Sequence, residues 1–461
     1  MAFTDKLHNR GSISTGFNID NSVKVENDNR EYLRWTNFSG NASEARKKKF
    51  SMSLWCKRTE LGRQQIIWST SQNGYLGFDA ADTVVWYQQY VGSGTQIGIR
   101  TTRKFRDTGA WYHFMIVVDT AQSTEANRVK MYVNGVQETV FGTPNTYPSQ
   151  NAQASNLYEQ HLILGEWGGG SEGFSGYIAE YYFLSEIAAS PTDLGEYDDD
   201  SGIWKPKAYS GTISSPSHFL EFKDGSDLGT ATSGLDSDYQ NNLTAADQST
   251  DTPTNNFCTL NPLWQGTLSY IGIIRNGATT LRYNTGTKAS AKATMGVTNG
   301  KWYWEAMPNG TIGSQYLGVQ TDVNFVSGTG LSQNYTMAIG AHGKYYSYSG
   351  SLSESSSSFT ALTTSNVIGV ALDLDSSTQT IKYYKDGSVF LTLDLISNMQ
   401  DETIFPFIQN YENRSFNLNF GGYTINTISS AASDADGYGT FEYAPPSGFY
   451  ALCTKNLAEY G

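Results

Sequence analysis

The stretch that decides the fold is Val367-Ile-Gly-Val-Ala-Leu-Asp-Leu374, which is followed by a loop, by Thr380-Ile-Lys-Tyr-Tyr384 and by Lys385-Asp-Gly-Ser388. Short apolar and aromatic runs of this kind are typical of β-strands. The Asp-Gly pair predicts a tight turn, because both residues tolerate the positive φ that such a turn requires. The stretch therefore predicts two paired strands and a third after the turn, Val389-Phe-Leu391.

The same arrangement occurs in the first half of the chain. Met115-Ile-Val-Val-Asp119 is followed by a loop, by Val129-Lys-Met-Tyr-Val133 and by the turn Asn134-Gly135. This repetition predicts two modules of one architecture, each a long meander of strands closed into a sandwich.

Length and composition agree with two β domains. The chain has 461 residues, whereas a single core stops growing at roughly 250 to 300 residues. Aromatic residues make up 13% of the chain, glycine occurs 46 times and charged residues are only 16%. This mixture suits pleated surfaces and tight turns rather than helices, so we expect an all-β protein.

Two segments of the first half illustrate the strand pattern. Phe50, Met52 and Leu54 alternate with Ser51 and other residues, which predicts a strand buried on one face. The run 111–119 is apolar on both faces and predicts a central strand. His113 lies in that run and is interpreted as a hydrogen-bonded core histidine, because no second histidine or carboxylate is close in sequence.

The composition changes between about Ser190 and Leu263, where Asp, Ser, Thr, Asn and Pro predominate. A flexible tether is one interpretation of this joining region. Its apolar residues Phe219, Leu220 and Phe222 would be exposed to water in a tether, so we expect part of the region to pack on a neighbour.

The formal net charge of -13 argues against nucleic acid as a partner, because phosphate binding is driven by clustered Lys and Arg. The run from Arg46 to Lys49 is interpreted as a solvated loop before a strand, and Ser355 to Ser358 as a low-complexity loop. Cys56, Cys258 and Cys453 are far apart and are expected to be free thiols.

Targeting signals are also lacking in the sequence. The first residues contain no apolar signal segment, and no run approaches the roughly 18 apolar residues that span a bilayer. We therefore expect no membrane insertion and folding in a cytoplasm.

Several segments carry side chains that could be catalytic or structural. Hydrolysis of a glycosidic bond needs two carboxylates about 5 to 10 Å apart. Asp373 and Asp375 share a strand end, but the parallel position of Asp119 indicates turn capping. The segment Gly169-Gly-Ser171-Glu-Gly173 matches a nucleophile-elbow pattern without its strand and helix, and is interpreted as a glycine loop.

Metal ligands are not predicted either. Asp198–Asp200 and Asp434–Asp436 could offer oxygens to calcium, but they lack the EF-hand spacing and are interpreted as exposed acidic loops. We expect no catalytic residue, no metal and no cofactor.

Tyrosine-rich segments are the places where a sugar could stack. The candidate ligand-binding residues are Tyr87, Tyr90, Tyr345, Tyr346 and Tyr348. The alternative is that these rings pack between strands, since tyrosine is an ordinary sheet residue.

Both halves of the chain resemble known families. The first 200 residues resemble the laminin-G-like concanavalin-A-like domain of phage structural proteins. The segments that carry this resemblance are residues 19–22, 32–33, 50–58, 111–114, 132–135 and 174–180. The second half is similar to a SPRY domain. The segments that carry this similarity are residues 300–305, 368–373, 383–387, 405–408 and 416–421.

The resemblance implies two concanavalin-A-like jelly-roll β-sandwiches in tandem, joined by a partly ordered linker. The implied boundaries are an N-terminal arm over 1–12, the laminin-G-like sandwich over 13–200, the joining region over 201–262 and the SPRY-like sandwich over 263–461. Fold alone does not settle function.

The resemblance further implies a virion structural protein of a tailed bacteriophage, assembled in the host cytoplasm. We expect a tail fibre or spike protein that binds a host-surface glycan or protein without catalysis. Its first sandwich and joining region would dock on other virion proteins, and the second sandwich would face outward. The alternatives are a capsid decoration or tail adaptor protein with a purely structural role and, second, a glycan-degrading enzyme.

We also expect a symmetric homo-oligomer. A trimer stays open, since no heptad stalk imposes a three-fold bundle.

Overall fold

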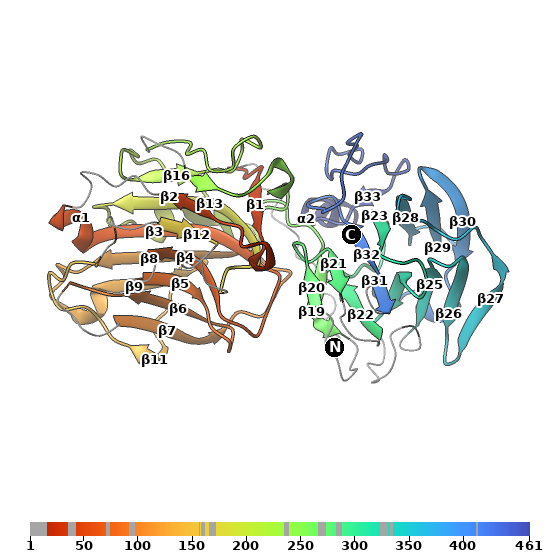
Figure 1. The fold of residues 1–461 in the computed structure, drawn as a ribbon, viewed down its shortest axis with the longest axis horizontal. Helices are drawn as coiled ribbons and strands as arrows, with labels where there is room; N and C mark the ends of the chain where they lie inside the picture. Colours follow the sequence, from red (N-terminus) through yellow and green to blue (C-terminus); the bar gives the residue numbers. More distant parts are fainter. Residues whose placement is uncertain are drawn as a thin grey trace. The chain divides into compact units, whose positions relative to one another are not determined.

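The computed structural model describes residues 16–35, 43–70, 74–91, 97–155, 157, 162–165, 172–234, 239–265, 273–282, 288–322, 331, 335–411 and 414–461 (Figure 1). These residues divide into an N-terminal unit that ends at Thr254 and a C-terminal unit that begins at Asn255. Each unit consists of two facing antiparallel sheets, so the predicted all-β fold with two sandwiches in tandem is confirmed. No helix in the described ranges has the length and apolarity that a bilayer crossing requires.

The two sheets of the N-terminal unit are named after strands near their centres. The β3 sheet has, in spatial order, β10 (Val136–Gln137), β9 (Val129–Val133), β8 (Tyr112–Asp119), β3 (Lys49–Arg58), β13 (Gly176–Ser185), β1 (Ser22–Val25) and β18 (Gln248–Ser249), with β16 (His218–Leu220) also paired to β13. The β5 sheet has β11 (Phe141–Asn145), β7 (Ile97–Lys104), β6 (Thr83–Gln88), β5 (Gly74–Phe78), β4 (Gln65–Thr70), β12 (Leu162–Leu164), β2 (Leu33–Trp35) and β17 (Gln240–Asn241). A short helix and a separate pair of strands complete this unit: α1 (Glu44–Lys48), β14 (Gly195–Tyr197) and β15 (Trp204–Pro206).

The C-terminal unit is built in the same way. The β24 sheet has β19 (Leu260–Gln265), β22 (Lys288–Ala293), β31 (Ile404–Tyr411), β24 (Tyr316–Thr321), β25 (Thr336–Gly340), β26 (Lys344–Tyr348) and β27 (Leu352–Ser358). The β23 sheet has β20 (Ile273–Arg275), β21 (Thr280–Arg282), β32 (Ser415–Asn419), β23 (Lys301–Asn309), β28 (Ile368–Asp373), β29 (Thr380–Lys385) and β30 (Ser388–Asp394), with β33 (Tyr450–Ala451) also paired to β23. The chain ends in α2 (Thr454–Tyr460).

Apolar side chains from the facing sheets fill the interior of each sandwich. In the N-terminal unit Phe50, Met52 and Leu54 of β3 lie in one buried cluster with Trp68 and Trp86 of the β5 sheet. Their predicted alternation toward a core is therefore confirmed. Burial of large apolar side chains, at about 1.5 to 3 kcal/mol each, is the main source of stability in such a sandwich.

The repeat predicted from the sequence is present in the sheet topology. β8, β9 and β10 follow β3 across one sheet, and β28, β29 and β30 follow β23 across another. The turns Asn134-Gly135 and Asp386-Gly387 both have positive φ at their two central residues, 49° and 78° in the first and 50° and 79° in the second. Both hairpins therefore turn as the sequence predicts.

The joining region expected over residues 201–262 is not a separate linker. Up to Thr254 its described residues belong to the N-terminal unit, where β16 and β18 pair with the β3 sheet and β17 with the β5 sheet. Phe219, Leu220 and Phe222 are buried, as their apolarity predicts. The joining region and the residues just before it cover the outer face of the β3 sheet. Ser51 on that face of β3 is therefore buried too. The expectation that β3 is buried on one face only is wrong.

Two buried lysines of the β3 sheet explain why the joining region belongs to this unit. Lys57 Nζ lies 2.7 Å from Asp251 Oδ2, and Trp111 Nε1 donates to the other oxygen of Asp251 at 3.0 Å. Lys24 Nζ lies 2.8 Å from Asp247 Oδ1. An uncompensated buried charge costs several kcal/mol, so the carboxylates of the joining region complete the N-terminal fold.

Two segments expected as loops have regular structure instead. Most of the run from Arg46 to Lys49 lies in α1, because the Ser43 hydroxyl caps this helix by accepting from the backbone N–H of Arg46. The run from Ser355 to Ser358 lies in β27, where pairing with β26 overrides the low strand preference of serine.

Candidate functional site

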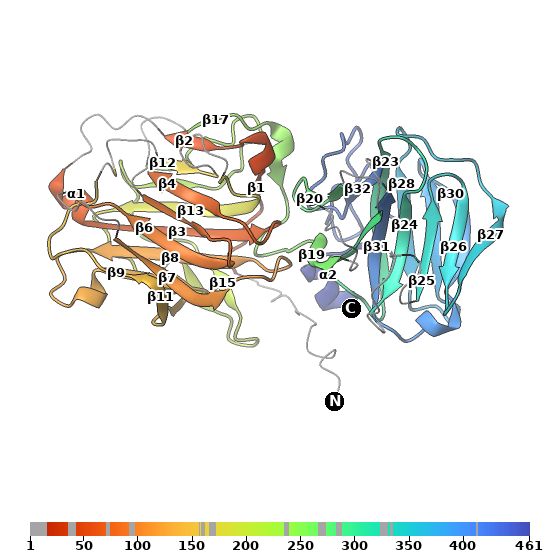
Figure 2. The ribbon, with the colours of Figure 1, turned by 60° about the horizontal axis from the view of Figure 1, so that its bottom comes forward.

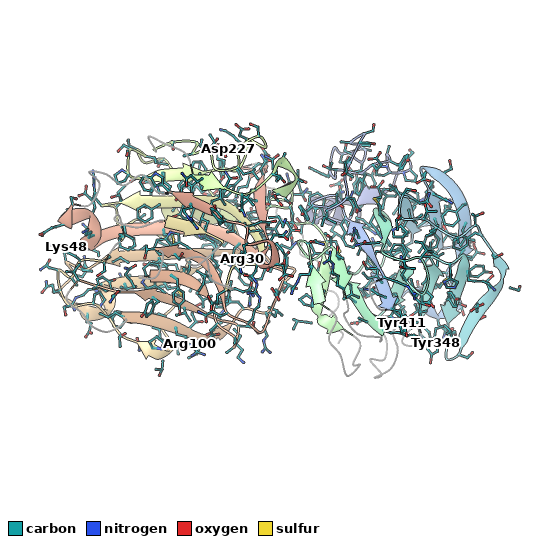
Figure 3. The ribbon with its side chains drawn as sticks, in the orientation of Figure 1. Arg30, Lys48, Arg100, Asp227, Tyr348 and Tyr411 are labelled. Atoms are coloured by element: carbon teal, nitrogen blue, oxygen red, sulfur yellow. The ribbon has the colours of Figure 1, made fainter. Side chains whose placement is uncertain are left out.

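The two candidate tyrosines of the N-terminal unit offer little surface to a ligand. Tyr90 is 2% exposed in the core, and burial raises its pKa. Tyr87 is 7% exposed and stacks on Tyr75 of the neighbouring strand, with ring centroids 5.2 Å apart. Arg100, which is labelled in Figure 3, forms an ion pair with Asp79 at 2.5 Å on the same sheet. A sugar needs an exposed ring face, so Tyr90 is better explained as a core residue and Tyr87 as half of a packed pair.

The three candidate tyrosines of the C-terminal unit lie on one strand, β26, but on both of its faces. Tyr345 packs at the border of the core between the sheets. Tyr346 lies on the outer face of the β24 sheet, where its ring is buried against Tyr316 and Phe407. Tyr348, labelled in Figure 3, is two residues further along the strand and partly exposed. Tyr348 is therefore the candidate of the three that can offer part of a ring to a ligand on this face.

The Tyr346 hydroxyl is the centre of a polar network that reaches the surface. It lies 2.7 Å from His342 Nε2 and donates to Glu354 Oε2 at 3.0 Å. Lys344 Nζ lies 3.1 Å from the other oxygen of Glu354. We call His342, Lys344, Tyr346, Tyr348 and Glu354 the β26 site.

The charges of the β26 site shift the pKa values of its members in opposite directions. The hydrogen bond from Lys344, and then that from Tyr346, lowers the pKa of Glu354, which stays ionised. Burial first, and then the bond to Glu354, raises the pKa of the Tyr346 hydroxyl, which keeps its proton. The site thus presents one carboxylate and one ammonium group side by side.

The hydrogens of this network do not suffice for all its bonds when His342 is neutral. His342 Nδ1 lies 3.0 Å from the carbonyl oxygen of Gly313, which can only accept. Tyr346 has one hydroxyl hydrogen, and Glu354 accepts it. The contact between Nε2 and the Tyr346 oxygen then needs a second hydrogen on the imidazole.

His342, Lys344 and Glu354 were not predicted from the sequence. Their prediction would have required the hairpin between β26 and β27 to be recognised. The turn of this hairpin contains Gly350 at a φ of 92°, and its register places Glu354 opposite Tyr346. A turn of Ser-Gly-Ser followed by a serine-rich run gives only a weak signal for a returning strand. Alternation along β26 could have shown Lys344 on the face of Tyr346 and Tyr348.

Residues assigned structural roles from the sequence have such roles. Asp373 accepts hydrogen bonds from two backbone amides of the turn that follows it, and Asp119 accepts one in the equivalent turn. His113 is fully buried between Ser53 Oγ at 2.7 Å and Trp204 Nε1 at 3.1 Å, and burial lowers its pKa to about 3. The prediction of a core histidine is confirmed.

The remaining candidate segments give no site in the part of the chain that the structure describes. Residues 169–171 of the glycine loop lie outside the described ranges. Asp198 and Asp434 accept hydrogen bonds from amides of their own loops, and no group of three or more His, Cys, Asp or Glu residues gathers among the described residues. Cys56, Cys258 and Cys453 are buried free thiols, as predicted.

Comparison with known proteins bears on the fold. Residues 27–193 match the family described as Concanavalin A-like lectin/glucanases superfamily. The matched segment runs from β2 to β13 and lies within the N-terminal unit. That segment is thus similar to laminin-G-like, concanavalin-A-like domains. No curated protein matches the chain.

Similar solved structures include the SPRY domain of human HERC1, at 16% identity, covering 36% of this chain and 99% of that chain, with a TM-score of 0.28. Domain 4 of the GH43 extracellular arabinanase AbnA from Geobacillus stearothermophilus, in complex with arabinotriose, is 24% identical, covering 32% of this chain and 64% of that chain, with a TM-score of 0.23. The heptameric SAP-like pentraxin from Limulus polyphemus is 15% identical, covering 37% of this chain and 78% of that chain, with a TM-score of 0.25. Likenesses this distant say nothing about ligands.

Proposed function

We propose that this protein binds carbohydrate at the β26 site and carries out no reaction on it. The observation that carries the proposal is the network around the Tyr346 hydroxyl, in which His342, Lys344 and Glu354 present hydrogen-bonding groups beside the partly exposed ring of Tyr348.

The chemistry of the β26 site suits a sugar ring. A sugar offers C–H groups on its face, which pack on an aromatic ring, and hydroxyl groups around its edge, which donate and accept. Hydrogen bonds to charged groups are about twice as strong as neutral ones, so a carboxylate and an ammonium group can orient such a ligand. The family description that matches residues 27–193, in the N-terminal unit, names both lectins and glucanases, so sugar binding is common to the roles it names.

The absence of catalysis is part of the proposal. Glycoside hydrolysis needs two carboxyl groups that face each other across the bond, and the β26 site contains one, Glu354. In the other acidic pair, Asp373 and Asp375, one oxygen of each carboxylate accepts from backbone amides, and the second oxygen of Asp373 accepts from the Ser376 hydroxyl, which supports a structural role.

The biological setting is proposed from the resemblance of the sequence to phage structural proteins. In this setting the protein belongs to the virion of a tailed phage, and the N-terminal unit attaches to other virion proteins. The C-terminal unit faces outward, and the β26 site meets a glycan or glycosylated receptor of the host surface. The rival is a purely structural decoration or adaptor protein, in which other subunits cover the β26 site.

The test uses the full chain on an array of bacterial surface glycans, followed by titration calorimetry with a retained glycan. We expect Tyr348→Ala to weaken binding about tenfold, because a stacked ring contributes about 0.5 to 1.5 kcal/mol beyond its buried area. Glu354→Gln is expected to weaken it by about 10- to 100-fold, because it removes a charged hydrogen-bond acceptor.

The matched control is Tyr197→Ala, which removes a tyrosine of the N-terminal unit that is 49% exposed. This variant should keep wild-type affinity. Failure of the wild-type chain to bind any host-surface glycan would overturn the proposal, as would equal affinity of all three variants. A reconstruction of the virion in which neighbouring subunits cover the β26 site would support the structural rival.

A further inference from the structure

One side of the C-terminal sandwich ends in two edge strands. β27 is the last strand of the β24 sheet and β30 is the last strand of the β23 sheet. Figures 1 and 2 both show them together at the same border of the unit. Phe359, which follows β27, contacts Phe390 of β30 with ring centroids 5.0 Å apart. Both sheets therefore end in an edge strand along this side.

β30 presents an apolar edge. Its sequence, Ser388-Val-Phe-Leu-Thr-Leu-Asp394, contains no proline and no charge before the final aspartate. Val389 is 54% exposed, and Leu391 and Leu393 are half-buried at the border of the core. Edge strands of soluble proteins are commonly protected by shortness, by charges or by proline, because their free N–H and C=O groups pair readily with another strand. β30 has seven residues and neither a proline nor a charge in its first six, and its register with β29 is interrupted once, at Phe390.

The equivalent strand of the N-terminal unit is protected. β10 has two residues, after which the chain leaves the β3 sheet and enters the β5 sheet at β11. Glu138 follows β10 directly and forms an ion pair with Arg103 at 3.0 Å. The difference between the two edges indicates that β30 is kept open for a partner.

We propose that β30 pairs antiparallel with β30 of a second copy of this chain, which makes a two-fold symmetric dimer with a continuous sheet. A two-fold axis pairs identical edges, so one strand can serve as both halves of the interface. Main-chain hydrogen bonds join the two sheets, and Leu391 and Leu393 of both copies bury their half-exposed side chains against each other.

The charges near β30 favour a second copy as its occupant. β30 carries one charge, Asp394 at its end, while its neighbour β29 carries Lys382 and Lys385. In an antiparallel pair centred on Leu391, Asp394 of each copy lies opposite Ser388 of the other, which pairs with Lys385 of β29, and the apolar centres of the strands meet. Like charges directly opposite each other destabilise a strand pair, and this arrangement has none within the paired strands.

Edge pairing extends a sheet sideways and leaves the outer face of the β24 sheet uncovered. The dimer therefore displays two β26 sites, and simultaneous attachment of both would raise the apparent affinity for a glycan-coated surface. This consequence rests on the proposed function, whereas the dimer does not.

The experiment is sedimentation velocity of the full chain over a range of concentrations, with two matched variants. Val389→Lys places a charge in the β30 edge, and Val136→Lys places the same charge on β10 at a valine that is 56% exposed. We expect the wild type and Val136→Lys to have twice the 50.7 kDa of one chain, and Val389→Lys to have the mass of one chain. Circular dichroism verifies that both variants keep their β structure.

Hydrogen exchange supplies a second readout that does not depend on a variant. The amides of β30 should exchange at least tenfold more slowly in the concentrated wild-type protein than after dilution below the dissociation constant, and those of β10 should not change. A wild-type mass of one chain or three chains at every concentration overturns the proposal. So does a Val389→Lys protein that stays dimeric, or a β30 whose exchange is independent of concentration.

Discussion

The two sandwiches share a meander but end it in opposite ways. In both, a central strand pairs with one that ends in an aspartate, and Lys49 with Asp119 and Lys301 with Asp373 occupy the same position in the register. Each meander then turns at a residue pair with positive φ. The N-terminal unit shortens the next strand and covers a sheet with its joining region, while the C-terminal unit leaves a seven-residue edge. The comparison suggests that one repeated core supports a sealed unit and a unit with surfaces free for partners.

The buried ion pairs of the joining region provide the strongest test of that contrast. Asp251→Ala leaves Lys57 buried without its carboxylate and removes the acceptor of Trp111. We expect the N-terminal unit to lose about 3 to 5 kcal/mol of unfolding free energy, because the buried lysine loses the carboxylate to which it is paired. Urea unfolding followed by hydrogen exchange assigns the loss to a unit.

The control for this prediction is Asp224→Ala, which removes an exposed acid of the same joining region. It should leave the free energy of unfolding nearly unchanged, since exposed charges contribute little. Equal losses in the two variants would show that the joining region is a tether after all.

A buried acid beneath the joining region gives the N-terminal unit a pH dependence. Glu180 lies in a bulge of β13, accepts from the Tyr182 hydroxyl at 3.1 Å and has its pKa raised to about 8, mainly by burial. Between the ordinary pKa near 4.5 and pH 8 the unfolded chain has lost this proton and the folded chain holds it. The contribution of Glu180 to stability therefore falls as pH rises through this window, by up to about 1.4 kcal/mol per pH unit, and above pH 6.5 the buried histidines no longer oppose it.

Glu180→Gln should remove this loss, because the amide has no proton to release. The measurement is the difference between the urea midpoints of the variant and the wild type at pH 5, 6.5 and 8, in which the contributions of His113 and His218 cancel. If the urea midpoint declined with rising pH as steeply in the variant as in the wild type, a group other than Glu180 would be responsible.

Two buried histidines should make the N-terminal unit less stable in acid. Burial lowers the pKa of His113 to about 3 and that of His218 to about 4. Below the ordinary pKa of 6.5 the unfolded chain binds protons that the folded unit does not, so stability falls as pH drops toward 4. In the C-terminal unit, by contrast, the histidine that the structure describes, His342, lies at the surface. Pepsin at pH 4 should cleave the N-terminal unit first, and early cleavage of the C-terminal unit would contradict this.

The two turns allow a smaller comparison. An alanine Cβ at Gly135 would lie 2.5 Å from the Trp204 ring, whose indole is fixed by its bond to His113. At Gly387 the nearest atom is 2.8 Å away in the ring of Tyr443, which is only half-buried and can move. Both alanines also have unfavourable φ, which costs about 1 to 2 kcal/mol. Thermal unfolding should show Gly135→Ala to be the more destabilising, and the reverse order would contradict this reading of the packing.

Local features of the fold were predictable from the sequence, and non-local ones were not. The strands around Met115 and Val370, the turns at Asn134 and Asp386 and the buried role of His113 follow from alternation and turn chemistry within a few residues. The covering of β3 by the joining region depends on Asp251 meeting Lys57, which lies 194 positions away. No local pattern encodes such a pair.

The candidate site was predictable only in part for the same reason. Alternation places Tyr346 and Tyr348 on one face of β26, but burial decides which of them is available, and burial depends on Tyr316 and Phe407 from other strands. Glu354 enters the site through the register of β27 with β26. A serine-rich strand is identified by its partner rather than by its own sequence.

The central claim is that the surface for a ligand lies on the C-terminal unit at the end of β26. Hydrogen exchange of the full chain, with and without a glycan that it retains, tests this directly. We predict slower exchange upon binding in residues 342–354 and no change around Tyr75 and Tyr87. Protection confined to the strands of Tyr75 and Tyr87, with residues 342–354 unaffected, would contradict the account.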